Sequence, residues 1–220
     1  MRIETDRQVW AKKFEGFLCR DGGFGDAAHD LGHVRRVVGT AMELAMQEGA
    51  DDAIVFAAAW LHDCVAVPKD SPDRAMGSRW AAAAAAQYLA REGWEASRIL
   101  SIEHAIEAHS FTASIEPRTI EAKVVQDADR LDALGAHGLA RCLMLAGSWK
   151  STLVHPTDPW AAHRELDDTK FAVDHFFAKL LKLPAMMTTK AGVIEAHRRA
   201  EVLKQFVREL ARERGEVSPV

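Results

Sequence analysis

The residues most able to do chemistry in this chain are a histidine and an aspartate set side by side in an apolar segment. His62 and Asp63 interrupt the stretch AAWLHDCVAV, whose other residues are typical of a buried helix. Charged groups are rarely fully buried unless they pair or hold a metal. Neighbouring side chains on a helix diverge by about 100°, so both could still reach one ion beside it. Alone, the doublet is equally compatible with a hydrogen-bonded core histidine followed by an aspartate that caps the helix end.

A second group of charges interrupts the apolar stretch VVQDADRLDALGA. Asp129 and Asp132 are three residues apart and can share a helix face. Asp127 and Asp129 diverge by about 200° on a helix, so they should not face the same ion. A helix whose acids pair with Arg130 is the alternative, but three acids in six buried-looking residues favour a site.

Further histidines lie near helix ends in the first half of the chain. His29 and His33 are four residues apart and share a face if the helix has begun by His29. His104 and His109 are five residues apart, or about 140° on a helix. His109 therefore serves the same site only if its helix ends or bends there, which the sequence HSFT suggests.

Together these residues predict a mixed nitrogen and oxygen site made of His33, His62, Asp63 and one aspartate of the 127–132 cluster. Imidazole and carboxylate ligands suit borderline or hard divalent ions, namely Mn, Mg, Fe, Co, Ni or Zn. Such an ion would also offset the desolvation of a buried carboxylate.

The elements that must position these side chains are helical. Apolar residues recur at helical spacing over about 9–18, 33–49, 53–65, 95–109, 160–182 and 188–213, and clear strand signals are absent from the sequence. Asp51 should cap the third segment, Ser71 with Pro72 should start the alanine-rich helix, and Gly93 should stop it. Residues 146–158 are expected to form a long functional loop. We predict a single all-α domain over residues 1–220.

Composition narrows the classes of partner. The 220 residues carry a net charge of −4, which gives no reason to expect a nucleic-acid polymer or an acidic membrane as partner. The three scattered cysteines lack metal or redox spacing and predict reduced thiols in a cytoplasmic protein. The apolar last helix could serve the core or a homodimer.

The motifs, taken in order, resemble the HD superfamily of metal-dependent phosphohydrolases. The resemblance rests on AHDLGHVRRV, LHDCVAVPKDSPDRAMGS and DADRLDALGA, and more weakly on DHFFAKLLKL. It covers about 26–145 closely, with C-terminal helices at about 159–213 packing on that core, and it is strongest to the small single-domain bacterial hydrolases. It implies an all-helical HD-type domain with the metal held between helices, and it assigns the ligands to His33, His62, Asp63 and Asp129.

The resemblance also implies a reaction. A divalent metal would activate water for attack on a phosphoester or phosphoanhydride, with a nucleotide as the first substrate to consider. Cations should hold the substrate phosphate. The candidates are Lys69 and Arg74 after the doublet, and Lys179 with Lys182, which are expected on one helix face. Asp63, Asp132 and His29 are the candidates for orienting the water or the leaving group.

Two alternatives stay open. His104 and His109 could hold a second metal, as in the di-iron oxygenases of the same superfamily, or they could support the first site or face the substrate. The chain lacks the extended Gly-Tyr-Pro signature of the cyclic-dinucleotide phosphodiesterases. A non-catalytic nucleotide-binding module is the other alternative, although an intact ligand set argues against it.

Overall fold

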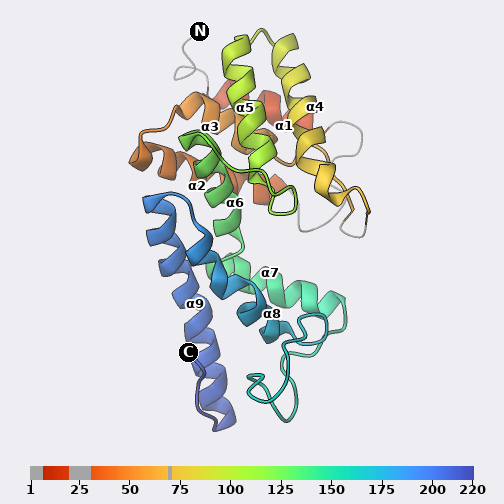
Figure 1. Cartoon of the computed structure of the whole chain (residues 1–220), viewed down its shortest axis with the longest axis vertical. Coiled ribbons are helices and arrows are strands. Elements are labelled where there is room, and N and C mark those ends of the chain that lie inside the picture. Colours follow the sequence, from red (N-terminus) through yellow and green to blue (C-terminus); the bar gives the residue numbers. More distant parts are fainter. Residues whose placement is uncertain (1–6, 20–30, 69–70) are drawn as a thin grey trace. The chain divides into compact units, whose positions relative to one another are not determined.

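A computed structural model describes residues 7–19, 31–68 and 71–220 of the chain. These fall into two compact units, Met1–Asp129 and Arg130–Val220 (Figure 1). Regular structure in the described ranges is helical, with one isolated bridge between Thr152 and Phe171. The all-α prediction is confirmed, while the single domain over 1–220 stays a prediction. None of the described helices is long and apolar enough to cross a membrane.

The first unit is built from helices whose ends follow local signals. They are α1 (Arg7–Leu18), α2 (Leu31–Glu48), α3 (Asp52–Leu61), α4 (Gly77–Arg91), α5 (Ala96–His109) and α6 (Ile120–Asp132), with a short 3-10 turn η3 (Arg74–Met76). Asp51 caps α3 as predicted, because its Oδ1 accepts hydrogen bonds from the backbone N–H groups of Ala53 and Ile54. Gly93, just beyond α4, takes a φ of 80°, a conformation that glycine adopts without steric cost. Figure 1 shows α4 and α5 packed side by side.

The predicted start of the alanine-rich helix is wrong. The Oγ of Ser71 accepts from the N–H of Asp73, and its carbonyl accepts from the N–H of Arg74, so Ser71 closes a turn. The chain continues through η3, and α4 starts only at Gly77. The reason is local, since a serine hydroxyl can satisfy turn and helix-start N–H groups equally well.

Aromatic side chains form one end of the first unit's core. Trp10 meets the edge of Trp94 at a ring-centroid distance of 5.2 Å, and Phe14 lies 6.0 Å from Phe56. All four side chains are buried. Fully burying a side chain such as Phe14 stabilises the fold by about 1.5–3 kcal/mol. This packing ties α1 to α3, the helix that leads directly into the His62–Asp63 doublet.

The second unit contains α7 (Gly135–Ser148), α8 (Ala172–Ala178), the 3-10 segment η4 (Leu180–Met186) and α9 (Lys190–Arg214). Thr189 caps α9 by accepting from the N–H of Gly192, and Gly215 ends it with a φ of 71°. Leu203 and Val207 of α9 are fully buried, which places them in the core of this unit.

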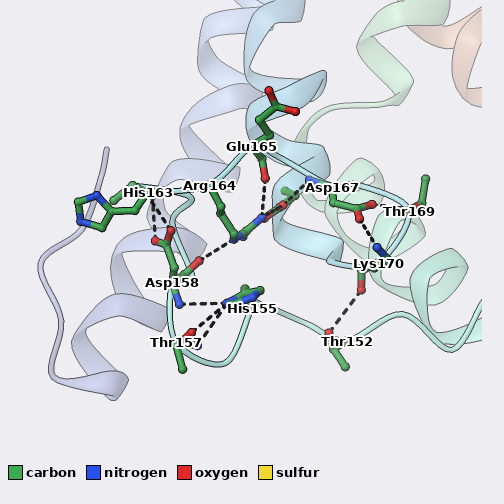
Figure 2. A network of polar contacts seen from close by, with 12 residues as sticks. Thr152, His155, Thr157, Asp158, His163, Arg164, Glu165, Asp167, Thr169 and Lys170 are labelled. Atoms are coloured by element: carbon green, nitrogen blue, oxygen red, sulfur yellow. Dashed lines mark hydrogen bonds and ion pairs between the residues drawn. The ribbon is translucent and has the colours of Figure 1, made fainter.

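The long loop between α7 and α8 is larger than predicted and replaces the first half of the helix expected at 160–182. Residues 149–171 form no helix but a dense set of hydrogen bonds (Figure 2). The carboxylate of Asp158 accepts from the N–H groups of Ala162 and His163, and Ala161 takes a left-handed φ of 53°. A helix cannot continue through that conformation, because the left-handed region is costly for a residue with a Cβ.

Candidate metal centre

Helix termini bring the histidines and aspartates of the first unit together. His33 lies in the first turn of α2, His109 is the last residue of α5, and Asp129 lies in the last turn of α6. Helix α3 ends at Leu61, so the doublet lies in the turn after the helix rather than on its wall. Val65 and Ala66, expected to be buried beyond it, are partly or largely exposed. Because a turn lets neighbouring side chains converge, His62 and Asp63 can face the same point.

The potential donor atoms are close to one another. The Nε2 atoms of His33 and His62 lie 3.3 Å apart, and the Oδ1 of Asp129 lies 3.4 Å from the first and 3.8 Å from the second. The Oδ2 of Asp63 lies 3.6 Å from the Nε2 of His62 and 3.9 Å from that of His33. The structure thus brings each of the four predicted ligands within 4 Å of at least one of the others.

Asp63 also faces a third histidine. Its Oδ1 lies 3.5 Å from the Nε2 of His109. Two sets of three donor atoms, each within 4.8 Å of one another, therefore share His62: one set adds His33 and Asp129, and the other adds Asp63 and His109. One oxygen of Asp63 faces the first set and the other faces His109.

Backbone carbonyls orient two of these rings. The Nδ1 of His62 lies 2.8 Å from the carbonyl oxygen of Ala59, and the Nδ1 of His109 lies 2.6 Å from that of Ile106. A carbonyl only accepts, so Nδ1 carries the proton in both rings and Nε2 of the neutral ring offers a lone pair. Metal-binding histidines commonly use this arrangement. These carbonyls were not predicted, although both lie three residues before their histidine at a helix end, where carbonyls lack helical partners.

The electrostatics of the cluster are set by burial and by contact between opposite charges. Burial is the largest influence on His62 and lowers its pKa, which favours the neutral ring. Burial also lowers the pKa of His109, but the hydrogen bond and the charge of Asp63 outweigh it, so that pKa is raised. Burial raises the pKa of Asp129, yet the hydrogen bond of His33 and the charges of His62, His33 and His109 bring it down to about 2.

The other two aspartates of the 127–132 cluster, Asp127 and Asp132, are buried outside the two donor sets. Asp127 is fully buried, and it belongs to neither set of donor atoms. Asp132 is buried at the end of α6, with its Oδ2 3.9 Å from the Nη1 of Arg141. Arg130 donates to the carbonyl of Met186 at 2.6 Å. Among the aspartates of the 127–132 cluster, Asp129 alone shares a described donor set with histidines.

His104 and His109 have different neighbours. The Nε2 of His104 accepts a hydrogen bond of 3.0 Å from the backbone N–H of Arg118. Burial, then the charge of Arg118, lowers the pKa of His104, which suits an acceptor ring. His104 belongs to neither described donor set, whereas His109 belongs to one.

The candidate phosphate-binding cations are spread over both units. Arg74 lies in η3 and donates from Nη1 to the carbonyl of Val67 at 2.6 Å. Lys179 follows α8 and Lys182 lies in η4, so no continuous α-helix gives them the common face that was expected. Both lysines are exposed. Lys69 and His29 lie outside the described residues.

Comparison with known proteins identifies the family. A model of the HD domain matches residues 30–134, a range that contains every member of the two donor sets. The uncharacterised protein YpgQ of Bacillus subtilis is 36% identical over 191 residues, which cover 85% of each chain. The chain belongs to the HD superfamily. This confirms the family that the motifs resemble.

Solved structures of HD-superfamily proteins have the same fold. The crystal structure of Bacillus subtilis YpgQ in complex with ADP is similar over 97% of each chain, with a TM-score of 0.71 and 30% identity. An HD-superfamily hydrolase from Bacillus thuringiensis is similar over 96% of this chain and 98% of its own, with a TM-score of 0.73 and 30% identity. This HD chain therefore has the fold of a superfamily of hydrolases and His/Asp groups able to hold a metal ion.

Proposed function

We propose that this protein is a divalent-metal-dependent phosphohydrolase that cleaves a phosphoester or phosphoanhydride bond of a nucleotide. The observation that supports it most directly is the convergence of His33, His62, Asp63 and Asp129 within the first unit. Membership of a superfamily that includes hydrolases supports the reaction class.

The donor set fits a divalent ion. Ligands that bind one ion at about 2.1 Å lie about 3.0–3.4 Å from one another at tetrahedral or octahedral angles. The separations of 3.3–3.9 Å between the Nε2 atoms of the histidines and the carboxylate oxygens are close to that range. Two imidazoles and two carboxylates are ligands for borderline or hard ions, so Mn, Mg, Fe, Co, Ni and Zn are all candidates. When bound, such an ion supplies Lewis acidity and lowers the pKa of a bound water.

Residues of the chain would orient the histidine rings, hold a proton and bind the substrate phosphate. Ala59 and Ile106 keep the rings of His62 and His109 oriented through their carbonyls. His109 and Asp63 form a pair that can hold a proton between Nε2 and Oδ1, at a separation of 3.5 Å. Lys69 and Arg74, which follow the doublet in the sequence, are our candidates for binding the substrate phosphate, and Lys179 and Lys182 stay predictions from the sequence. Asp132 and His29 remain candidates for orienting the water or the leaving group.

A nucleotide is the substrate class that the relatives favour. YpgQ, which resembles this chain over nearly its whole length, has been crystallised in complex with ADP. A nucleoside di- or triphosphate offers both the phosphoanhydride bond and the negative charge that cations near the doublet would bind.

The test begins with metal-free protein that is checked for folding and then loaded with Mn, Mg or Co. Release of phosphate or pyrophosphate is measured over a panel of nucleotides and generic phosphoesters. Metal-dependent release from at least one nucleotide is expected. A folded, metal-loaded sample that releases nothing from the whole panel would contradict the proposal.

The same samples separate the alternatives. Tight nucleotide binding without turnover would favour a binding module. Two irons per chain with oxygen uptake would favour an oxygenase, but the hydrogen bond between His104 and the N–H of Arg118 argues against His104 as a second ligand.

A further inference from the structure

The last residues of α6, which immediately follow Asp129, belong to the second unit and make their contacts within it. Helix α6 runs without a break to Asp132, and its last residues belong to the second unit. The final four carbonyls of a helix have no helical partner. The N–H groups of Ala133 and Leu134 donate to the carbonyls of Arg130 and Leu131, and a side chain that adds a further bond there restrains the last turn of α6, which includes Asp129.

Arg199 of α9 binds one of these carbonyls. Its Nη1 donates to the carbonyl oxygen of Leu131 at 2.9 Å. A positive charge at a helix C-terminus is also favoured by the helix dipole. The guanidinium is itself held, because its Nε donates to the Oε1 of Glu195 at 2.6 Å. Only about a fifth of the Arg199 side chain is exposed.

Gly135 gives the stem of Arg199 a second contact with the same end. Gly135 begins α7 directly after the turn that follows α6, and it has a φ of 71°. A Cβ built at this position would lie 3.4 Å from the Cγ of Arg199. The aliphatic stem of Arg199 therefore lies against the start of α7, while its guanidinium binds a carbonyl at the end of α6.

The geometry points to Arg199 as a positioning residue for the metal centre: it binds no metal itself, but by holding the Leu131 carbonyl it fixes the helix turn that presents Asp129. Arg130 reinforces the hold by donating to the carbonyl of Met186. The inference rests on the proposed function only in taking Asp129 as a metal ligand.

The experiment measures the affinity of the full chain for Mn²⁺ alone by calorimetry, in the wild type and in Arg199→Ala, at a temperature where both are folded by circular dichroism. Loss of a group that orients a ligand typically weakens metal binding about tenfold or more, and an effect relayed through one helix turn should fall near threefold to tenfold. The matched control is Arg198→Ala, which removes an exposed arginine that also binds Glu195. It should leave the affinity unchanged.

A residue with a purely structural role would lower the thermal midpoint without changing metal binding. The second readout is therefore the rise in thermal midpoint on adding Mn²⁺, which should shrink in Arg199→Ala and not in Arg198→Ala. Arg199→Lys keeps a donor for the Leu131 carbonyl and should regain most of the affinity.

If Arg199→Ala does not fold, Arg199→Lys and Glu195→Gln serve as the test variants, the second because it loosens the guanidinium while keeping its charge. Both should show smaller losses of affinity. Wild-type affinity in every folded variant would overturn the inference while leaving the metal site intact. Failure of the wild type to bind Mn²⁺ would instead contradict the proposed function.

Discussion

The two units each contain a cluster of charged and polar side chains, and the clusters differ in which chemical groups meet. In the first unit, ligand atoms of His33, His62 and Asp129 converge, and the Nδ1 atoms of His62 and His109 face backbone carbonyls. In the second unit, the loop 149–171 pairs the carboxylates of Asp158 and Asp167 with donors of its own (Figure 2).

Asp174 of α8 and Arg164 of the loop show what an internally balanced cluster looks like. The buried carboxylate of Asp174 accepts from two guanidinium nitrogens of Arg164, at 2.5 and 2.8 Å, and from the N–H of Asp167 at 2.7 Å. Arg164 also lies over the ring of Phe171 at 4.9 Å. Such a cluster has a structural role, whereas several buried imidazole and carboxylate groups that converge from different helices favour a site for a cation.

The largest expected effect is at Asp63. Asp63→Ala should weaken Mn²⁺ binding by on the order of 100-fold or more, because it removes the carboxylate shared by the cluster. Calorimetry on the folded variant measures the change. Asp73→Ala, an exposed acid in the following turn, should bind as the wild type does. Retained binding in Asp63→Ala would refute the assignment of the site.

A substitution in the cluster of Asp174 and Arg164 should lower the free energy of unfolding. Asp174→Ala leaves the Arg164 guanidinium without its two-point partner, and we expect a loss of about 3 kcal/mol in the free energy of unfolding. Urea denaturation measures it. Glu92→Ala, in the exposed pair with Lys13, should cost less than about 1 kcal/mol. Equal losses in the two variants would remove the distinction between a balanced buried cluster and a surface pair.

The pH dependence of the metal-free protein tests the first cluster. His62 has a lowered pKa, so its contribution to stability is present above pH ~6.5 and is lost as the pH falls, because the unfolded chain then binds the extra proton. His109 has a raised pKa, so its contribution is present below pH ~6.5 and is lost as the pH rises. The two contributions oppose each other.

Removing the contribution of His109 should make the pH-dependent contribution of His62 to stability measurable. His109→Gln in EDTA should lose stability between pH 7.5 and 5.5 more steeply than the wild type, by at most about 1.4 kcal/mol per pH unit for one proton. Urea midpoints at several pH values measure the slope. A slope equal to that of the wild type would show that the pKa of His109 is the same in the folded and the unfolded chain.

The smallest expected effect is in the loop. The Nδ1 of His155 accepts from the N–H groups of Thr157 and Asp158, as a side-chain oxygen does in an Asx turn. His155→Ala should cost about 1 kcal/mol and speed amide exchange at those two residues. His155→Asn, which keeps an acceptor, should restore much of the protection. Unchanged exchange in His155→Ala would show that the turn does not depend on this ring.

Much of the fold could be predicted because its signals are local. Asp51 as a cap, Gly93 beyond α4 and the helix over 95–109 all follow from side chains that act on the neighbouring backbone. The loop 149–171 was only partly predicted. Its helical spacing is overridden by contacts such as that between Arg164 and Asp174, which are ten residues apart and leave no periodic signal.

The chemistry of the candidate centre follows from the amino-acid sequence alone, because imidazole and carboxylate groups in apolar segments require a partner or an ion whatever the fold. That the chain is helical also follows from the sequence. Tertiary structure alone decided which side chains meet: α3 stops before His62, α5 ends at His109, and the last turn of α6 presents Asp129. Side-chain direction at a helix end depends on where the backbone leaves the helix, and that is set by packing between segments far apart in the chain.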